Sequence, residues 1–308
     1  MLARSEVRVD VLDRLDRATV EAVTALVDAV TEQDGVRPLS EHVTLHLRYG
    51  GDAPGCNVLA YDGSATLVAY AHLDVTNAVA GPSAELAVHP AYRGRGIGRR
   101  VVQELLDAGP DGRLRLWAHG GLPAAAALAA SMGFEQVREL WQMRRSLFAS
   151  VPAATLPADV RVRTFRPGED DEEWVKLNAR AFASHPEQGA WTIEDLHRRM
   201  AEPWFDAHGF FVAEREGRLV GFHWTKIHGG DGHSHGHEPI GEVYVVGVDP
   251  SAQAGGLGRA LTLIGLAHLR SRGLPQVMLY VDADNAGAIA VYQSLGFTRW
   301  DTDVMFRR

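Results

Sequence analysis

Hydrophobic and polar positions in the second half of the chain follow two alternating periods. The spacing of amphipathic helices, with an apolar residue every three or four positions, occurs at 169–182, 192–200, 256–273 and 285–296. Runs typical of strands lie between these segments, at 160–165, 209–214, 218–227, 241–248, 276–281 and 297–307. Gly273 closes the third helical segment, as glycine commonly does. Strands mixed with helices in this order predict an α/β or α+β sheet domain.

The first half has the same order of elements, so the chain contains a repeat. "VRVD" at 7–10 recurs as "VRVR" at 160–163, and "LVAY" at 67–70 recurs as "LVGF" at 219–222. Pro90 corresponds to Pro250, and the "MGF" that ends at Phe134 corresponds to the "LGF" that ends at Phe297. The stretch 146–160 contains two prolines and little periodicity, which is typical of a linker. We therefore predict two homologous domains, 1–150 and 151–308.

Composition restricts the classes of function. The 308 residues are 46% hydrophobic and 23% charged, as in soluble globular proteins. A net charge of −8 argues against a general nucleic-acid or anionic-membrane surface, because such surfaces need clustered Lys and Arg. Cys56 is the single cysteine, so no disulfide forms within the chain and a reducing cytoplasm is expected. The N-terminal residues lack the apolar region of a secretory signal, and no apolar run is long enough to cross a membrane.

A glycine-rich loop follows a strand and precedes a helix in both domains. It reads "RGRGIG" at 93–98 and "QAGGLG" at 253–258. Glycines leave backbone N–H groups uncovered, and a helix N-terminus adds unpaired donors and the positive end of its dipole. The loop therefore suits a phosphate or pyrophosphate, with a purely structural turn as the alternative. The glycine spacing matches neither a Rossmann dinucleotide loop nor a P-loop.

The loops and the elements around them resemble the Gcn5-related N-acetyltransferase (GNAT) family. Its signature, [Q/R]-x-x-G-x-G/A, occurs twice, and each copy is followed by a strand, a helix and an "[ML]GF" strand start. The resemblance implies two tandem GNAT domains, each with a mixed, mostly antiparallel central sheet flanked by helices. It also implies acetyl-CoA as cosubstrate and no metal. The residues that it assigns to acetyl-CoA are, in domain 1, Leu86, Ala87, Val88, Arg93, Gly94, Arg95, Gly96, Ile97 and Gly98, and, in domain 2, Val246, Gly247, Val248, Gln253, Ala254, Gly255, Gly256, Leu257, Gly258, Arg259, Asn285, Ala286, Gly287, Ala288, Ile289 and Ala290.

Longer stretches resemble one tandem branch of this family, found in actinobacteria, that acetylates the cysteinyl amine of cysteinyl-glucosaminyl-inositol. They include "HPEQGAW" at 185–191, "GFHWTK" at 221–226, "GEVYVVGVDP" at 241–250 and, in the first half, "DGVRPLSEHV" at 34–43. The resemblance implies that this acceptor contacts Glu41, Glu187, Lys226, Glu242 and Tyr280. A monomer without nucleic-acid or membrane partners is expected. Acetylation of another small amine, such as an aminoglycoside or polyamine, and a non-catalytic acyl-CoA-binding role stay open as alternatives.

Three groups in domain 2 suit the chemistry of acetyl transfer, which needs a base for the ammonium proton, a polarised carbonyl and an acid for the departing thiolate. Glu242, on the strand before the loop, is the candidate base, a role that the family resemblance also gives it. Tyr292 is the candidate acid, and backbone N–H groups at 246–248 are candidate donors to the acetyl carbonyl if the strand splays there. The alternatives are an exposed strand residue for Glu242, a core tyrosine for Tyr292 and a solvated helix face for Glu41.

Counting from the repeated motifs predicts which domain reacts. In domain 1, Ala129 and Leu122 occupy the positions that correspond to Tyr292 and Asn285. Glu242 stands eight residues before Pro250, and the residue eight before Pro90 is Pro82. Domain 2 is therefore predicted to be the catalyst, while domain 1 binds acetyl-CoA without turnover or has a structural role. Because only the first loop carries arginines, we expect domain 1 to hold CoA more tightly.

The segment 228–241 is rich in glycine and histidine. His233, His235 and His237 alternate with small residues, which would allow a metal site. A glycine-rich loop does not hold ligands in a defined geometry, so a mobile surface loop is favoured, with a possible role as a lid over the acceptor.

Overall fold

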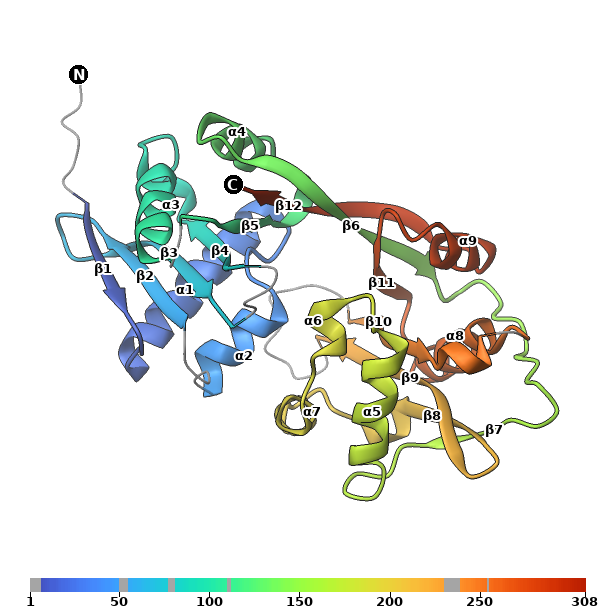
Figure 1. The fold of residues 1–308 in the computed structure, drawn as a ribbon. Coiled ribbons are helices and arrows are strands. Elements are labelled where there is room, and N and C mark those ends of the chain that lie inside the picture. Colours follow the sequence, from blue (N-terminus) through green and yellow to red (C-terminus); the bar gives the residue numbers. More distant parts are fainter. Residues whose placement is uncertain (1–6, 50–54, 77–80, 110–111, 230–238, 254) are drawn as a thin grey trace. The chain divides into compact units, whose positions relative to one another are not determined.

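The chain forms two compact units, shown as a ribbon in Figure 1. The structure is a computed structural model and describes residues 7–49, 55–76, 81–109, 112–229, 239–253 and 255–308. Unit 1 contains Met1–Trp141, Asp282–Asp284 and Asp301–Arg308, and unit 2 contains Gln142–Val281 and Asn285–Trp300. Each unit has its own apolar cores.

The division between the units differs from the repeat-based boundary near residue 150. It falls between Trp141 and Gln142, within a long strand, and the last eight residues of the chain belong to unit 1. These terminal residues join unit 1 because Val304–Arg307 pair antiparallel with Arg115–Ala118. Pairing between residues so far apart in sequence leaves no mark in a local pattern, so the repeat could not indicate it.

The first helix of unit 1 has ends that are set by local signals. The Asp16 side chain accepts a hydrogen bond from Thr19 N (2.8 Å) at the first turn, and Gly35, with φ of 72°, closes the helix. In chain order the elements of this unit are β1 (Arg8–Leu12), α1 (Arg17–Asp34), α2 (Glu41–Tyr49), β2 (Gly55–Tyr61), β3 (Leu67–Asp74), β4 (Ser83–Val88), η1 (Pro90–Tyr92), α3 (Ile97–Ala108), β5 (Arg115–Ala118), η2 (His119–Gly121) and α4 (Pro123–Ser131).

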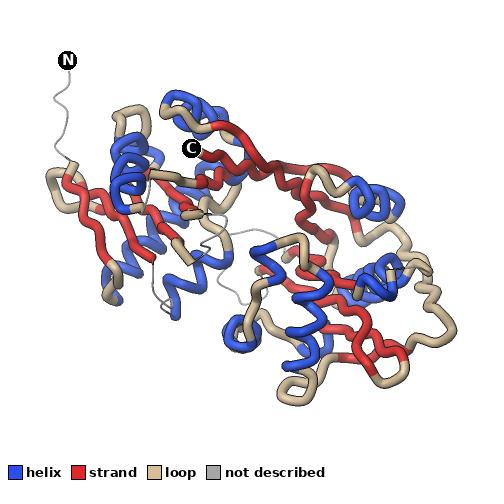
Figure 2. The backbone as a smooth tube through the Cα atoms, viewed as in Figure 1, coloured by secondary structure: helices blue, strands red, loops and turns tan. Residues whose placement is uncertain are grey.

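The sheet of unit 1 is covered by helices on both faces. Two consecutive residues of β2 belong to different cores. Val58 packs in a core with Val101 and Leu105 of α3, whereas Leu59 packs in a core with Leu26 of α1. A strand buried on both faces is expected to be apolar at consecutive positions, as this one is. Figure 2 shows α1 and α3 on either side of the strands.

Unit 2 repeats the order of elements with insertions. The strand β6 (Glu135–Ser146) carries residues of both units, as does β12 (Thr298–Arg307). The other elements are β7 (Arg161–Thr164), α5 (Asp171–Ala181), α6 (Pro186–Gly189), α7 (Ile193–Met200), η3 (Ala207–Gly209), β8 (Phe210–Arg215), β9 (Arg218–His228), β10 (Ile240–Val248), η4 (Pro250–Ala252), α8 (Leu257–Ser271), β11 (Gln276–Asp282) and α9 (Ala286–Ser294). The helices and strands predicted for this half are confirmed.

The sheet of unit 2 also has two apolar cores. One contains Trp174 of α5 and Leu196 of α7, packed on Phe222 and Trp224 of β9. The other contains Leu261 of α8, packed on alternate sheet residues such as Val220. Among the strand pairs described, β4–β5 and β10–β11 are parallel and the others antiparallel, which agrees with the predicted mixed, mostly antiparallel sheets. No helix in the described part of the chain is long and apolar enough to span a membrane.

Candidate functional site

Strand β10 separates from β11 halfway along its length. The parallel pairing with β11 covers Gly241 to Val243, while pairing with β9 continues to Val248. The register with β9 shifts at this point, because Tyr244 and Val245 together oppose Trp224. Such a β-bulge bends a strand and ends regular pairing. Alternate backbone groups of residues 246–248 therefore point away from β9 on the side where β11 no longer pairs, as the predicted splay requires.

Gly247 lies in this splayed segment, and packing alone requires it to be glycine. A Cβ atom at this position would lie 2.5 Å from Cε1 and 2.7 Å from Cζ of Phe222, which is fully buried. Close approach of the ring to the backbone excludes any side chain here. The predicted contact of Gly247 with acetyl-CoA is thus not the only reason for a glycine at this position.

The glycine loop of unit 2 leads into the N-terminus of α8. Gly255 and Gly256 adopt φ of 94° and 76°, which other residues rarely tolerate, and the helix begins at Leu257. Gly256 occupies the N-cap position, so no side chain among the described residues caps the helix. The first amides of α8 thus keep the capacity to bind an anion, which fits the pyrophosphate assigned to Gln253, Gly255–Gly258 and Arg259. Ala254 lies outside the described residues.

The loop of unit 1 has the same backbone form. Gly94 and Gly96 adopt φ of 72° and 83°, and α3 begins at Ile97 without a side-chain cap among the residues described. Its two arginines, however, are already used within the unit. Arg93 donates to both carboxylate oxygens of Asp34 and to Val88 O, and Arg95 donates to Ala91 O. Asp34 neutralises Arg93, so this loop offers less positive charge to a phosphate than its two arginines suggest.

In each unit an ion pair joins the loop region to the first long helix, but the loop region supplies the cation in unit 1 and the anion in unit 2. In unit 1 the loop supplies the cation, Arg93, and the end of α1 supplies Asp34. In unit 2 Asp249, just before the loop, accepts from Arg180 of α5 at 2.7 Å. The two loops therefore differ less in effective charge than the residues at 93–98 and 253–258 suggest.

Glu242 lies on β10, just before the splay, and is buried. The residue is 7% exposed, which excludes the alternative of an exposed strand residue. One carboxylate oxygen, Oε2, lies 2.6 Å from Nε2 of His228, the last residue of β9. Glu242 also faces Lys226 across the β9–β10 ladder. His228 was not among the predicted site residues, because its partner follows fourteen residues later, across a connection whose geometry the sequence does not define.

Lys226 is buried among aromatic side chains. The residue is 8% exposed, and its Nζ lies 4.3 Å from the ring centroid of Trp204 and 5.1 Å from that of Tyr244. Ring faces stabilise an ammonium group that has lost much of its hydration. Arg199 of α7 lies over Trp191 at 3.7 Å and donates to Tyr244 Oη at 2.9 Å. The aromatic rings thus surround the cation next to Glu242.

Tyr280 extends the same face of the sheet onto β11. It stands two residues after Met278, which pairs with Glu242, so the side chains of Tyr280 and Glu242 lie on one face. Tyr280 is 41% exposed and its hydroxyl accepts a hydrogen bond from Gln142 Nε2 at 2.8 Å. The structure therefore brings Lys226, Glu242 and Tyr280 together. Glu187 lies in α6, with a side chain outside the description, and Glu41 is the half-buried first residue of α2 in unit 1.

Helix α9 carries the candidate acid and a further stretch assigned to acetyl-CoA. Tyr292 is half-buried, packs edge-on against Phe297 at 5.9 Å, and burial raises its pKa to about 12. Asn285 caps this helix, because its Oδ1 accepts from Ala288 N at 3.1 Å. The remaining assigned residues, Ala286, Gly287, Ala288, Ile289 and Ala290, form the first turns. Asn285 thus has a structural role beside its predicted one.

Comparison with known proteins identifies the family. The model of the acetyltransferase (GNAT) family matches residues 172–297, and that of the acetyltransferase (GNAT) domain matches 54–136. The mycothiol acetyltransferase of Acidothermus cellulolyticus is 61% identical, over 99% of this chain and 95% of its own length. The mycothiol acetyltransferase of Streptosporangium roseum is 58% identical, over 98% of this chain and 99% of its own length. The chain belongs to the mycothiol acetyltransferase family.

Solved structures support the tandem fold of this mycothiol acetyltransferase family member. A tandem GNAT protein from the clavulanic acid biosynthesis pathway superposes with a TM-score of 0.73, at 21% identity and over 98% of both chains. A GCN5-related N-acetyltransferase from Sphaerobacter thermophilus has a TM-score of 0.68, at 24% identity, over 97% of this chain and 95% of its own. The predicted fold of two GNAT domains is confirmed, and the chain is an acetyl-CoA-dependent N-acetyltransferase.

The position in unit 1 that corresponds to Glu242 differs from the one predicted by counting. Leu116 and Leu279 correspond to each other, because they lie equally far before the repeated Gly-Phe pairs. Leu116 pairs with Ala84 and Leu279 pairs with Val243, so Ala84 corresponds to Val243. The residue that precedes Ala84, and therefore matches Glu242, is Ser83 rather than Pro82. The count was wrong by one residue because the β-bulge at Tyr244 adds a residue to β10. In this mycothiol acetyltransferase family member, unit 1 still has no carboxylate at the position that corresponds to Glu242.

Unit 1 has instead a buried ionic cluster further along β4. His119 Nδ1 lies 3.0 Å from Asp303 Oδ2, and its Nε2 lies 3.7 Å from Glu85 Oε2, an ion-pair distance rather than a hydrogen bond. Glu85 Oε2 also accepts from the backbone N–H of Ser40, and the other carboxylate oxygen of Asp303, Oδ1, accepts from the backbone N–H of Gly120. Burial by itself would lower the pKa of His119, but Asp303 and Glu85 outweigh it and raise that pKa to about 10. Glu85 is therefore held as a carboxylate in a fixed ion pair.

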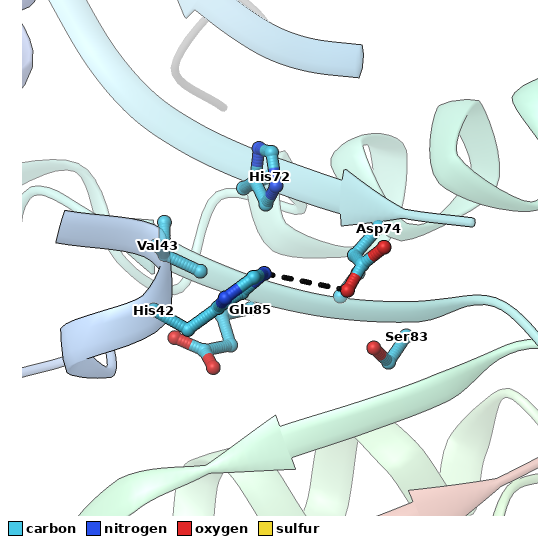
Figure 3. Close-up of a pocket in the computed structure, with 7 residues that line it drawn as sticks. His42, Val43, His72, Asp74, Ser83 and Glu85 are labelled. Atoms are coloured by element: carbon cyan, nitrogen blue, oxygen red, sulfur yellow. Dashed lines mark ion pairs between the residues drawn. The ribbon is translucent and has the colours of Figure 1, made fainter. Parts of the chain in front are cut away.

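A small cavity of about 20 Å³ lies beside this cluster, with room for about one water molecule. Figure 3 shows His42, His72, Asp74, Ser83 and Glu85 around it, with the His42–Asp74 ion pair of 3.4 Å as a dashed line. Burial, and then the neighbouring histidines, lower the pKa of His72 to about 4, so this imidazole is neutral. The cavity is too small for an acceptor of sugar size.

The predicted metal alternative falls outside the structure. His233, His235 and His237 lie in 230–238, which the structure does not describe. Among the residues that it does describe, there is no group of three or more His, Cys, Asp or Glu side chains placed to hold a metal ion.

Proposed function

We propose that this chain transfers the acetyl group of acetyl-CoA to the cysteinyl amine of cysteinyl-glucosaminyl-inositol, which yields mycothiol and CoA. The names of its relatives support this reaction class, because they are at least half identical over nearly the whole chain. The observation that carries the proposal is the position of Glu242, a buried carboxylate on β10 directly before β10 separates from β11.

Acetyl-CoA would be held in unit 2 by backbone groups. The amides at the N-terminus of α8 and the glycines at 255–258 suit its pyrophosphate, and the splayed segment at 246–248 suits its acyl end. Asn285 and the first turns of α9 lie downstream, where the resemblance assigns further contacts. When bound, acetyl-CoA supplies the activated acetyl group as a thioester.

Glu242 is proposed as the general base of the reaction. The acceptor amine must lose a proton before its lone pair can attack a carbonyl carbon, and a carboxylate beside the site can accept that proton directly or through water. Carbonyl polarisation falls to the backbone N–H groups at 246–248, which need no reorganisation because the strand already holds them away from β11.

Tyr292 is proposed as the donor to the departing sulfur. Its pKa of about 12 means that it keeps its proton throughout the neutral range. A thiol is a stronger acid than such a phenol, so Tyr292 stabilises the developing thiolate chiefly by a hydrogen bond and gives up its proton only as that charge forms.

The acceptor face combines charge with exposed hydroxyl and aromatic groups. Lys226 and Glu242 supply a cation and an anion, and Tyr280 adds a hydroxyl on the same face. Charged groups make the stronger hydrogen bonds to hydroxyls and ammonium groups, which suits a polyhydroxylated amine. Glu187 of α6 is proposed as a further contact.

Unit 1 is proposed to bind acetyl-CoA without turnover. Its loop has the same backbone form as that of unit 2, but Ser83 stands at the position of the base and the buried Ala129 at that of Tyr292. We further propose that the protein is a cytoplasmic monomer whose partners are small molecules.

The test is an assay of the purified full chain with acetyl-CoA and cysteinyl-glucosaminyl-inositol. Product is followed by mass spectrometry, because the thiol of the acceptor would disturb a thiol-reagent readout for CoA. Glucosaminyl-inositol without cysteine, an aminoglycoside and a polyamine serve as the comparison panel. We expect acetylation of the cysteinyl amine well above that of the panel. Equal or lower acetylation than any panel member would overturn the assignment.

A further inference from the structure

We infer that His228 is the positioning residue of Glu242, and that it relays the amine proton from this carboxylate to solvent. The inference rests on the proposed function of Glu242 as the base and goes beyond it, since it assigns a role to a side chain that contacts neither acetyl-CoA nor acceptor in that proposal. Its basis is the 2.6 Å contact between His228 Nε2 and Glu242 Oε2.

The backbone determines this contact. His228 is the last residue of β9 and pairs with Ile240, while Glu242 pairs with Lys226. His228 and Glu242 are thus diagonal neighbours on one face of an antiparallel ladder, a separation that long side chains bridge easily. A distance of 2.6 Å is typical of a charge-assisted hydrogen bond. The imidazole therefore limits the carboxylate to one rotamer.

Burial makes a relay useful. The side chain of Glu242 is 9% exposed, whereas that of His228 is 36% exposed, so the imidazole links the buried carboxylate to water. Lys226 is the other charged group directly opposite Glu242, but an ammonium has donors only and cannot accept a proton. Arg199 of α7 cannot accept one either, and it donates to Tyr244. Tyr280, the hydroxyl on β11, accepts from Gln142.

The proton path balances without any other reactant. The acceptor ammonium loses a proton to a carboxylate oxygen of Glu242, and the freed nitrogen lone pair attacks the acetyl carbon. In the resting pair, Nε2–H of a neutral His228 donates to the carboxylate. Once Glu242 is protonated, proton exchange between the ring and water gives the Nδ1–H tautomer, whose Nε2 takes the proton from the carboxyl. The imidazolium then releases its Nδ1 proton to water, which restores the carboxylate and the Nε2–H imidazole.

A purely structural role for His228 is the competing explanation, and the chain offers a matched control. His197 Nε2 lies 2.7 Å from Asp171 Oδ2 and joins α7 to the start of α5, with side chains 53% and 8% exposed. This pair has nearly the same distance and burial as His228–Glu242, but it lies apart from the proposed machinery. His197→Gln and His228→Gln should therefore cost similar stability.

The experiment compares His228→Gln, His228→Ala and His197→Gln with the parent chain, using acetyl-CoA and cysteinyl-glucosaminyl-inositol. We expect both His228 variants to lower kcat about 10- to 100-fold with little change in KM for acetyl-CoA, and His197→Gln to leave both within about twofold. Added imidazole should restore part of the activity of His228→Ala, a rescue that a purely structural role does not predict.

The result that would overturn the inference is an active parent chain whose His228 variants keep kcat within about twofold. A fall in kcat for His228→Ala without imidazole rescue, matched by the same fall for His197→Gln, would likewise assign His228 a structural role. Failure of the proposed function looks different, because the parent chain itself would then not acetylate this acceptor.

Discussion

Arg93 of the first glycine loop and Asp34 at the end of α1 form a bidentate ion pair, with both nitrogen–oxygen distances at 2.7 Å. The arginine that looks available for a phosphate is thus engaged by a carboxylate from the neighbouring helix. Removal of that carboxylate should release it.

We therefore predict that Asp34→Asn strengthens CoA binding in unit 1. A freed guanidinium gains a charge-assisted contact with phosphate, which should lower the Kd of this site by about three- to tenfold. Two-site calorimetry on the full chain measures it, with the unit 2 site as internal reference. The double variant with Arg93→Gln should lose the gain. An unchanged Kd in Asp34→Asn would mean that Arg93 does not reach the ligand.

Glu242→Gln should lower kcat by about 10²- to 10⁴-fold, the usual contribution of a general base, with KM for acetyl-CoA nearly unchanged. The amide keeps the shape and a hydrogen bond to His228 but cannot take a proton. Ser83→Ala, at the matching position of unit 1, is the control and should leave steady-state kinetics as in the parent chain. If Ser83→Ala lowered kcat as much as Glu242→Gln, the division of labour between the units would be wrong.

Tyr292→Phe should lower kcat by about 10- to 100-fold without moving any limb of the pH profile below about pH 10. Burial raises the pKa of this phenol to about 12, so it does not titrate within the range in which the enzyme is assayed. Kinetics of both proteins between pH 6 and 10 measure this. An alkaline limb that is present in the parent chain and absent in Tyr292→Phe would show that the phenol ionises in that range.

The buried imidazolium of unit 1 predicts a pH dependence of stability. The pKa of His119 is about 10 in the folded chain, above the value of about 6.5 expected when unfolded. A raised pKa means that its contribution is fully present below about pH 6.5 and is lost as pH rises through about 10. Urea unfolding of the full chain across this range measures it.

The variant for this test is His119→Asn, which cannot carry the charge. It leaves Glu85 and Asp303 buried without their cation, so it should cost about 3–5 kcal/mol at pH 6. The alkaline loss of stability should also be shallower in the variant. Equal slopes for the variant and the parent chain between pH 7 and 10 would contradict a charged His119.

Much of the fold and the second glycine loop could be predicted from the sequence, because these features depend on local patterns. Helical spacing indicated α7, α8 and α9, and the glycines at 94, 96, 255 and 256 marked turns that need positive φ. Glu242 and Lys226 lie in strands, as the patterns at 241–248 and 218–227 predicted, and the structure pairs these two strands.

Errors arose wherever two distant segments meet. The count that matched Glu242 with Pro82 missed the β-bulge at Tyr244, which exists only as a relation between β10 and β9. The charge assigned to the first loop missed Asp34, which comes 59 residues before Arg93. His228 was not predicted as a site residue because Glu242, the carboxylate that it contacts, lies on the next strand.

The sequence by itself determined the order of the elements, the repeat, the two phosphate-type loops and the family. Tertiary structure alone decided which loop charges are neutralised and which residue of unit 1 corresponds to Glu242. It also decided that the final strand segment belongs to unit 1 and which imidazole contacts Glu242. The physical reason is that helix periods and glycine turns are set by neighbouring residues, whereas strand register and ion pairs are set by packing between segments far apart in the chain.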